Sequence, residues 1–155
     1  MPAQGAFTSG MREMIRSVPL FAGVSTAGLQ LLEQHARESV VPAGHLVVQE
    51  GDPGKHLFFV EQGTVRIYKE GRGKERELAR MTEGGLFGEM GILDRDGRSA
   101  SVQAVTETKL VVMGYVAFEV LADHQPLDYA RVLENLAREL VVRLRQLDDR
   151  FSTIT

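Results

Sequence analysis

The most regular pattern in the chain lies between Val40 and Met113, where short apolar runs alternate with turn residues. The runs are rich in β-branched and aromatic residues, which favour strands. Glycine, proline and aspartate separate the runs, as expected for turns. In chain order the runs are VV, LVVQ, LFFVE, TVRIYK, ELARM, ASVQAV and TKLVVM. About eight short strands at this spacing predict an antiparallel β-roll or jelly roll over residues 39–114.

Helical periodicity precedes this β-rich region. We expect N-terminal helices within residues 11–38, one over 11–16 and a second over 25–37 with Ser25 as its N-cap. The apolar stripe of the second helix consists of Leu29, Leu32 and Ala36. Residues 1–10 are small and polar, which is typical of a flexible terminus.

Two C-terminal helices are predicted over residues 115–150, and Pro126 is well placed to begin the second, over 126–150. This helix carries a heptad seam, which predicts a two-helix interface and hence a homodimer, although packing on the β-roll alone is an alternative. The seam consists of Ala130, Leu133, Ala137, Leu140, Leu144 and Leu147. A second apolar stripe, expected to pack on the β-roll, consists of Val132, Leu136 and Val142.

The elements together predict a single, mainly β domain with helices on both sides, and the composition fits a soluble protein. The net charge of -3 disfavours a nucleic-acid surface, which is usually strongly basic. The absence of cysteine excludes disulfides and thiolate metal sites. No apolar run approaches the roughly 20 residues that span a bilayer, and the N-terminus lacks a secretory pattern. We therefore expect a cytoplasmic protein without a nucleic-acid or membrane partner.

Residues 87–102, FGEMGILDRDGRSASV, combine features of an anion site with a carboxylate. Gly88 and Gly91 leave backbone N–H groups accessible, and consecutive N–H groups in a turn attract anions. Arg98 adds a planar set of donors that matches phosphate oxygens. Glu89 would repel a phosphate placed directly against it. The pattern therefore fits a phosphate site only if a neutral group stands between Glu89 and the phosphate.

This order of elements resembles the cyclic nucleotide-binding domain family, in particular its catabolite activator protein branch. The likeness extends from Pro19 to about Leu147 and includes PLFAGVS and VVPAGHLVVQEGDPGKHLFFVEQGTVRIY. Residues 87–100 correspond to the family's phosphate-binding cassette, in which FGE, apolar residues, a loop and RSA follow one another. The resemblance implies a β-roll between helices that binds a regulatory 3′,5′-cyclic nucleotide and is not an enzyme.

The resemblance also implies roles within the cassette. Glu89 would accept a hydrogen bond from the ribose 2′-hydroxyl, which is neutral and can donate, while Arg98 would pair with the cyclic phosphate. Backbone groups and small side chains would complete the contacts at Gly88, Met90, Gly91, Ser99 and Ala100. Alternatively, Arg98 could pair with Asp94 or Asp96 on a solvated loop, and Glu89 could open a helical turn at the surface.

The group that faces the base is less clearly defined. In the family, a residue of the last helix covers the purine, and the catabolite activator branch uses a Thr-Ser pair for this. In this chain, Arg143 and Leu144 stand at the positions of that pair. Arg143 could stack on a purine or donate to it, or it could pair with Glu139 at the surface. The hydroxyl of Ser99 makes cGMP an alternative ligand, because some relatives that prefer cGMP have a hydroxyl residue at this position. The RSA form favours cAMP.

Two other functions are alternatives to this interpretation. Cupin-like enzymes hold a metal on a jelly roll with histidines and a glutamate, for which His45, His56 and Glu61 are candidates. The four histidines show no His-x-His or other ligand spacing, so no metal is predicted. The second alternative is the sensor half of a transcription regulator. Such regulators carry a helix-turn-helix domain after the last helix, and we expect no such domain before Thr155. The sequence thus predicts a stand-alone cAMP or cGMP sensor that signals through its last helix to an unidentified protein.

Overall fold

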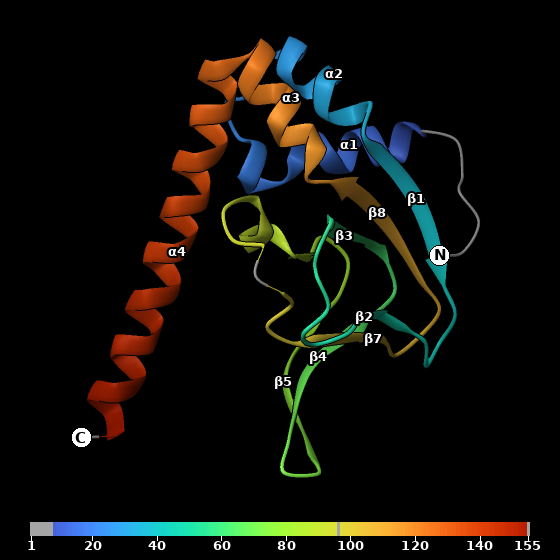
Figure 1. The fold of residues 1–155 in the computed structure, drawn as a ribbon, viewed down its shortest axis with the longest axis vertical. Helices are drawn as coiled ribbons and strands as arrows, with labels where there is room; N and C mark the ends of the chain where they lie inside the picture. Colours follow the sequence, from blue (N-terminus) through green and yellow to red (C-terminus); the bar gives the residue numbers. More distant parts are fainter. Residues whose placement is uncertain (1–7, 96, 155) are drawn as a thin grey trace.

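Two antiparallel sheets form the body of the domain (Figure 1). The computed structural model describes residues 8–95 and 97–154. Within them, the strands are β1 Ala36–Val41, β2 Leu46–Val48, β3 His56–Gln62, β4 Val65–Gly71, β5 Lys74–Met81, β6 Leu86–Phe87, β7 Ser101–Ala104 and β8 Thr108–Gly114. The first sheet has the strand order β1-β8-β3-β6 and the second β2-β7-β4-β5. The predicted antiparallel β-roll is therefore confirmed.

Helices precede and follow the β-roll, as predicted. They are α1 Ser9–Ser17, the 3-10 turn η1 Pro19–Phe21, α2 Thr26–Glu33, the 3-10 turn η2 Glu89–Ile92, α3 Val116–His124 and α4 Pro126–Ile154. The hydroxyl of Thr8 accepts from the N–H of Met11 at 3.2 Å and caps α1. The hydroxyl of Ser25 accepts from the N–H of Gly28 at 3.1 Å, which confirms Ser25 as the N-cap of α2.

The core has two layers because the central strands of the first sheet are buried on both faces. On β3, Leu57 and Phe59 pack toward the helices, while Phe58 and Val60 pack between the two sheets. Consecutive side chains of a strand point to opposite faces, so both faces can be apolar only in a continuous apolar run. The run LFFVE has this character, and β8 follows the same alternation.

The N-terminal half of α4 is attached to the other helices. Val132 and Leu136 are fully buried in the helical layer, and the side-chain amide of Asn135 donates to two carbonyl oxygens at the η1 turn, each at 2.9 Å. The buried carboxylate of Asp128 accepts from the backbone N–H of Ser25 at 2.9 Å and from its hydroxyl. The C-terminal half of α4 extends past this layer, alongside the β-roll (Figure 1).

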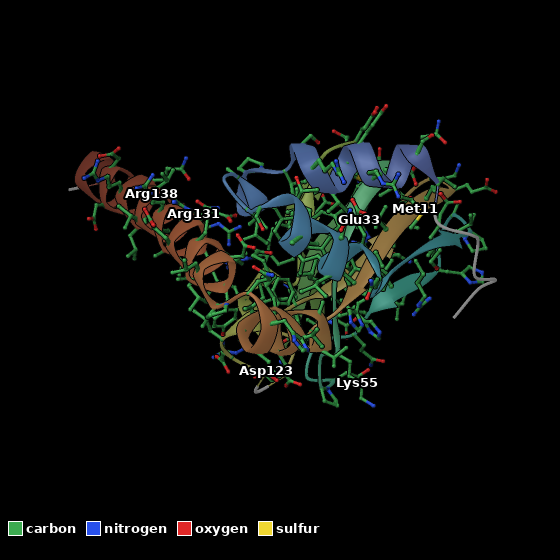
Figure 2. The ribbon with its side chains drawn as sticks, turned by 90° about the horizontal axis from the view of Figure 1, so that it is seen from above. Met11, Glu33, Lys55, Asp123, Arg131 and Arg138 are labelled. Atoms are coloured by element: carbon green, nitrogen blue, oxygen red, sulfur yellow. The ribbon has the colours of Figure 1, made fainter. Side chains whose placement is uncertain are left out.

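Charged residues join α1 and α2 at the edge of the helical layer. Glu33 on α2 is 8% exposed, and its carboxylate lies 3.1 Å from Arg16 and 3.5 Å from Arg12 on α1. Figure 2 shows Glu33 between these two helices, whereas Arg131 and Arg138 lie along α4 away from it. The two α4 arginines are about half exposed or more, so they mark the solvent side of that helix.

The boundary between the second helix and the first strand differs from the prediction over 25–37. The helix ends at Glu33, and β1 already begins at Ala36. The strand begins early because residues from Ala36 onward pair with β8, starting opposite Met113. Of the predicted helical stripe, Leu32 is fully buried, but Ala36 belongs to the strand.

The two ends of the chain also differ from the predictions. Helix α1 begins at Ser9, so the segment 1–10 predicted to be flexible ends in a helix, and residues 1–7 lie outside the described residues. Helix α4 continues to Ile154, beyond the predicted residue 150. The packing predicted for Val142 is wrong, because this side chain is 55% exposed where α4 has left the helical layer. None of the described helices has the length and apolar character needed to cross a membrane.

Candidate functional site

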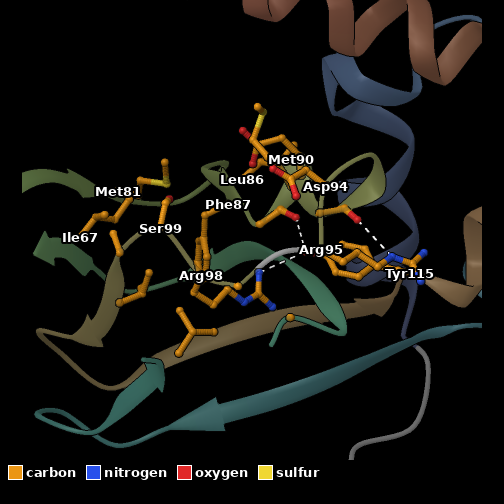
Figure 3. Close-up of a pocket in the computed structure, with 18 of the residues that line it drawn as sticks. Ile67, Met81, Leu86, Phe87, Met90, Asp94, Arg95, Arg98, Ser99 and Tyr115 are labelled. Carbon is orange, nitrogen blue, oxygen red and sulfur yellow. Dashed lines mark hydrogen bonds between the residues drawn. The ribbon is translucent and has the colours of Figure 1, made fainter. Parts of the chain in front are cut away.

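A cavity of about 330 Å³ lies between the cassette, residues 87–100, and the C-terminal half of α4. All eight residues predicted from the sequence to contact a ligand line this cavity, and Figure 3 shows several of them. They are Gly88, Glu89, Met90, Gly91, Arg98, Ser99, Ala100 and Arg143. The fold thus brings the two ends of the cassette and a residue of the last helix to one place.

The start of the cassette is fixed by aromatic packing and by a glycine turn. The ring of Phe87 stacks on that of Phe58 with centroids 4.9 Å apart, which anchors β6 to β3. Gly88 then adopts a φ of +84°, a left-handed conformation that glycine adopts without steric cost. The chain turns there into η2, and Ile92 secures the far end of η2 in the core. Glu89 therefore opens a helical turn, as in the alternative considered for it, but the turn is anchored in the core and Glu89 is buried.

Gly91 permits the close approach of a tyrosine that the sequence did not single out. A Cβ at this position would lie 2.0 Å from the Tyr115 hydroxyl oxygen, so any side chain here would displace the ring. Tyr115 is 2% exposed, and its hydroxyl donates to the carbonyl oxygen of Gly88. Burial raises the pKa of Tyr115, which keeps the hydroxyl protonated and able to donate.

Arg98 lies in a narrow slot formed by two glycines. A Cβ on Gly54 would lie 2.8 Å from the central carbon of the guanidinium, and a Cβ on Gly88 would lie 2.8 Å from Nη1. Nη1 donates to the Tyr115 hydroxyl at 3.1 Å, and Nη2 donates to the carbonyl oxygen of His56 at 2.7 Å. The guanidinium therefore has a defined orientation at the cavity wall, set by two neutral oxygen atoms.

The backbone of Arg98 is fixed as well. Its N–H donates to the carbonyl of Asp52 at 2.8 Å, and its carbonyl accepts from Gly51 at 2.9 Å, which joins the cassette to the β2–β3 loop. Burial, followed by the charges of Arg37 and Arg98, lowers the pKa of His56 beside it. Arg37, Arg98 and Lys55 contribute to this shift and place positive charge near His56, which suits an anionic group.

Glu89 faces the same cavity and is 3% exposed. Its Oε1 accepts from Nη2 of Arg143 at 2.6 Å, and the same nitrogen donates to Glu139 at 2.7 Å. Of the two roles considered for Arg143, the structure contains the pair with Glu139, and it adds the pair with Glu89. The cassette carboxylate is therefore bonded directly to α4.

The charges in this cluster shift one another's protonation. Burial, followed by the negative charge of Glu89, raises the pKa of Glu139. Burial by itself would lower the pKa of Arg143, but the two carboxylates outweigh it and raise that pKa. Arg143 thus stays charged and offsets part of the negative charge that Glu89 places in the cavity.

The second half of the cassette brings small residues to the cavity and one more cation. Ser99 and Ala100 follow Arg98 at the cavity wall. Arg95 also lines the cavity, where its Nε donates to the carbonyl of Gly91 at 3.3 Å and its guanidinium lies 3.3 Å from Glu119 of α3. Apolar residues form another part of the lining, namely Val48, Ile67, Met81, Leu86 and Val102.

Several residues that line this cavity were not singled out as ligand contacts in the sequence, among them Gly54, Asp94, Arg95 and Tyr115. Gly54 looks like an ordinary turn residue in the GDPG loop, and Tyr115 like one more aromatic residue after a strand. No local spacing connects either of them to Arg98, because their contacts depend on how the β2–β3 loop and the end of β8 fold over the cassette.

The residues considered for a metal do not form a ligand set in the described part of the chain. His45 lies in the turn before β2, His56 begins β3, and Glu61 lies near the opposite end of β3. Among the described residues, no group of three or more histidine, cysteine, aspartate or glutamate side chains could hold a metal ion.

Comparisons with known proteins agree with this geometry. The profile of the cyclic nucleotide-binding domain family matches residues 38–125, more than half of the chain. The cyclic AMP receptor protein of Thermus thermophilus is 36% identical over 135 residues, which cover 86% of this chain and 61% of that protein. A cyclic nucleotide-gated potassium channel of Rhizobium etli is 31% identical over 127 residues, covering 82% of this chain and 34% of the channel.

A solved structure shows the same fold. A cyclic nucleotide-binding domain from Methylobacillus flagellatus matches with a TM-score of 0.76 at 27% identity, covering 94% of this chain and 83% of that one. The chain spans only about three fifths of the receptor protein and about a third of the channel. The resemblance found in the sequence is confirmed, and the chain belongs to the cyclic nucleotide-binding domain family.

Proposed function

We propose that this domain is a regulatory sensor that binds a 3′,5′-cyclic nucleotide, preferentially cAMP, in the cavity beside the cassette. One observation carries the proposal: a buried carboxylate, Glu89, and an oriented guanidinium, Arg98, line the same cavity of about 330 Å³. Arg98 binds the cyclic phosphate through charge-assisted hydrogen bonds. Glu89 accepts from the ribose 2′-hydroxyl, a neutral donor, so this carboxylate does not face the phosphate directly.

The remaining predicted residues complete this arrangement. The turn at Gly88 and Gly91 presents backbone to the sugar and phosphate, and Ser99 and Ala100 bring small side chains beside the phosphate. The positive charge of Arg143 supports the proposal, because it balances Glu89 and lowers the repulsion between that carboxylate and an anionic ligand. The apolar part of the lining suits the faces of the sugar and base.

The choice between cAMP and cGMP rests on the cassette ending. RSA is the form of the catabolite activator branch and favours cAMP, whereas the exposed hydroxyl of Ser99 keeps cGMP as the alternative. Nη2 of Arg143 already donates to Glu89 and Glu139. A hydrogen bond from Arg143 on α4 to a purine would therefore use its other N–H donors.

Occupancy is relayed through α4. The N-terminal half of this helix is fixed to the other helices through Asp128 and Asn135, while Arg143 joins its C-terminal half to the cassette. A ligand that engages Glu89 changes the electrostatic environment of Arg143 and so shifts the population of docked and undocked α4. The output is a surface change that a partner protein reads, and the sensor itself performs no catalysis.

We place a dimer contact on the C-terminal half of α4. Leu144 is 60% exposed and Leu147 is 47% exposed, and both belong to the predicted seam. Apolar side chains at this spacing on a helix that projects alongside the body favour pairing with the same helix of a second copy. Leu133 packs partly against the core, so the contact is centred toward the C-terminal end.

Calorimetry with cAMP, cGMP and AMP tests the proposed ligand. We expect binding of cAMP, weaker binding of cGMP, and little binding of AMP, which lacks the cyclic phosphate. Arg98→Ala removes the charged donor and should weaken cAMP binding by about 2–4 kcal/mol, roughly 30- to 1000-fold. Arg138→Ala is the matched control, because Arg138 is 76% exposed on α4. Failure of the wild type to bind any cyclic nucleotide, or unchanged affinity in the Arg98 variant, would refute the proposal.

A further inference from the structure

Tyr115 occupies a junction between three parts of the domain. It lies between the end of β8 and the start of α3, and its backbone N–H donates to the carbonyl of Lys55 at 2.9 Å. Its side chain is 2% exposed and extends to the cassette, where it lines the cavity with Arg98 (Figure 3). Tyr115 is therefore a rigidly placed group beside the proposed phosphate-binding arginine.

The Tyr115 hydroxyl connects the two ends of the cassette. It accepts a hydrogen bond from Nη1 of Arg98 at 3.1 Å and donates one to the carbonyl oxygen of Gly88. A hydroxyl can do both at once, whereas no apolar ring can do either. Because this hydroxyl is buried, the bond to the guanidinium is made away from water and is stronger for it.

Two hydrogen bonds to described residues orient the Arg98 guanidinium. Of its five N–H donors, one is directed to Tyr115 and one to the carbonyl of His56, and the proposed ligand would engage others. The aromatic rings of Phe58 and Tyr115 lie 5.7 Å and 5.9 Å from the guanidinium carbon and add weaker attraction. A long arginine side chain loses much rotamer freedom in one orientation, so removal of a contact allows it to move.

We propose that Tyr115 is a positioning residue for the ligand site: its hydroxyl holds the Arg98 guanidinium in the orientation that presents other N–H donors to the cyclic phosphate. This inference rests on the proposed function of the cavity and adds a residue that does not itself need to touch the ligand. Gly91 permits this contact, because a Cβ at position 91 would lie 2.0 Å from the Tyr115 hydroxyl oxygen.

Tyr115→Phe removes the hydroxyl and keeps the ring. We expect cAMP affinity measured by calorimetry to fall roughly 10- to 100-fold, the loss of one hydrogen bond to a charged group. The melting temperature should change little, because the buried ring stays. Tyr68→Phe is the matched control, since Tyr68 is a buried tyrosine on β4 that does not line the cavity. Gly91→Ala tests the same contact without changing the tyrosine and should show a similar loss.

Two further measurements separate positioning from a general effect on the fold. In the double variant Arg98→Ala/Tyr115→Phe, affinity should equal that of Arg98→Ala alone, because Tyr115 acts through Arg98. The two phosphorothioate diastereomers of cAMP carry sulfur on one or the other exocyclic position. An oriented guanidinium distinguishes them, so the wild-type preference should shrink roughly threefold or more in Tyr115→Phe.

The outcomes distinguish this inference from the function on which it rests. If the wild type binds no cyclic nucleotide, the proposed function fails and the positioning role fails with it. If the wild type binds cAMP but both Tyr115→Phe and Gly91→Ala bind equally well, only the positioning role is overturned. Losses that multiply in the double variant, or an unchanged preference between the diastereomers, also overturn it.

Discussion

The slot around Arg98 allows a test of the phosphate site by a single methyl group. Gly54→Ala adds a Cβ that would lie 2.8 Å from the guanidinium carbon and 2.9 Å from Nε of Arg98. Non-bonded carbon atoms prefer a separation of about 3.5–4.0 Å, so the guanidinium has to move by about 1 Å. The backbone of Gly54 does not have a positive φ, so alanine fits there without backbone strain.

The magnitude of the effect follows from the contacts that this shift breaks. The bond from Nη2 to the His56 carbonyl is 2.7 Å long, and a shift of about 1 Å away from it exceeds hydrogen-bonding distance. The displaced guanidinium also faces a bound phosphate from the wrong position. Loss of about one hydrogen bond to a charged group costs about 2 kcal/mol, so cAMP affinity should fall roughly 30-fold. Stability should change little, because only a flexible side chain moves.

Titration calorimetry and thermal unfolding should be measured side by side on the same variants. Gly71→Ala is the matched control, because a Cβ at Gly71 meets no atom within 4 Å and the position has no positive φ. Affinity for cAMP within twofold of the wild type in Gly54→Ala, at an unchanged melting temperature, would refute the reasoning. It would mean that ligand binding does not use the orientation of Arg98 seen here.

Two further predictions concern the sugar and the α4 interface. If Glu89 accepts from the 2′-hydroxyl, 2′-deoxy-cAMP should bind the wild type at least about tenfold more weakly than cAMP. Glu89→Gln should reduce that difference in affinity. Equal binding of the two ligands to the wild type would contradict this role. If α4 pairs with a second copy, Leu144→Glu should convert a dimer into a monomer in sedimentation experiments. The control Leu127→Glu, at a site 86% exposed at the start of the same helix, should remain dimeric. A monomeric wild type would contradict the dimer.

Local patterns in the sequence were enough for the architecture. Alternating and continuous apolar runs predicted the strands of the β-roll, because the period of a strand and the burial of both its faces are written into consecutive residues. Ser25 and Pro126 marked the starts of α2 and α4 for an equally local reason, since capping depends on the first few residues of a helix. The residues of the cassette were likewise found from their order along one short segment.

The start of β1 could not be predicted in this way. Residues 34–37 continue a helix-like pattern, but pairing with β8 starts opposite Met113 and draws Ala36 into the sheet. Val142 shows the same limit, because its place on an apolar stripe gave no information on where α4 leaves the helical layer. In both cases, a neighbour distant in the sequence decides the outcome.

The sequence by itself determined the fold class, the starts of α2 and α4, and eight of the residues that line the cavity. The fold class and the helix starts depend on local periodicity and capping, and seven of the eight residues lie in one contiguous motif. Arg143 was found through the resemblance to the family. Only the tertiary structure decided what those residues contact. It brought the hydroxyl of Tyr115 and the slot at Gly54 to Arg98, and it joined Glu89 to Arg143 across the cavity. Such contacts depend on the packing of segments far apart in the chain, and local spacing carries no information about that packing.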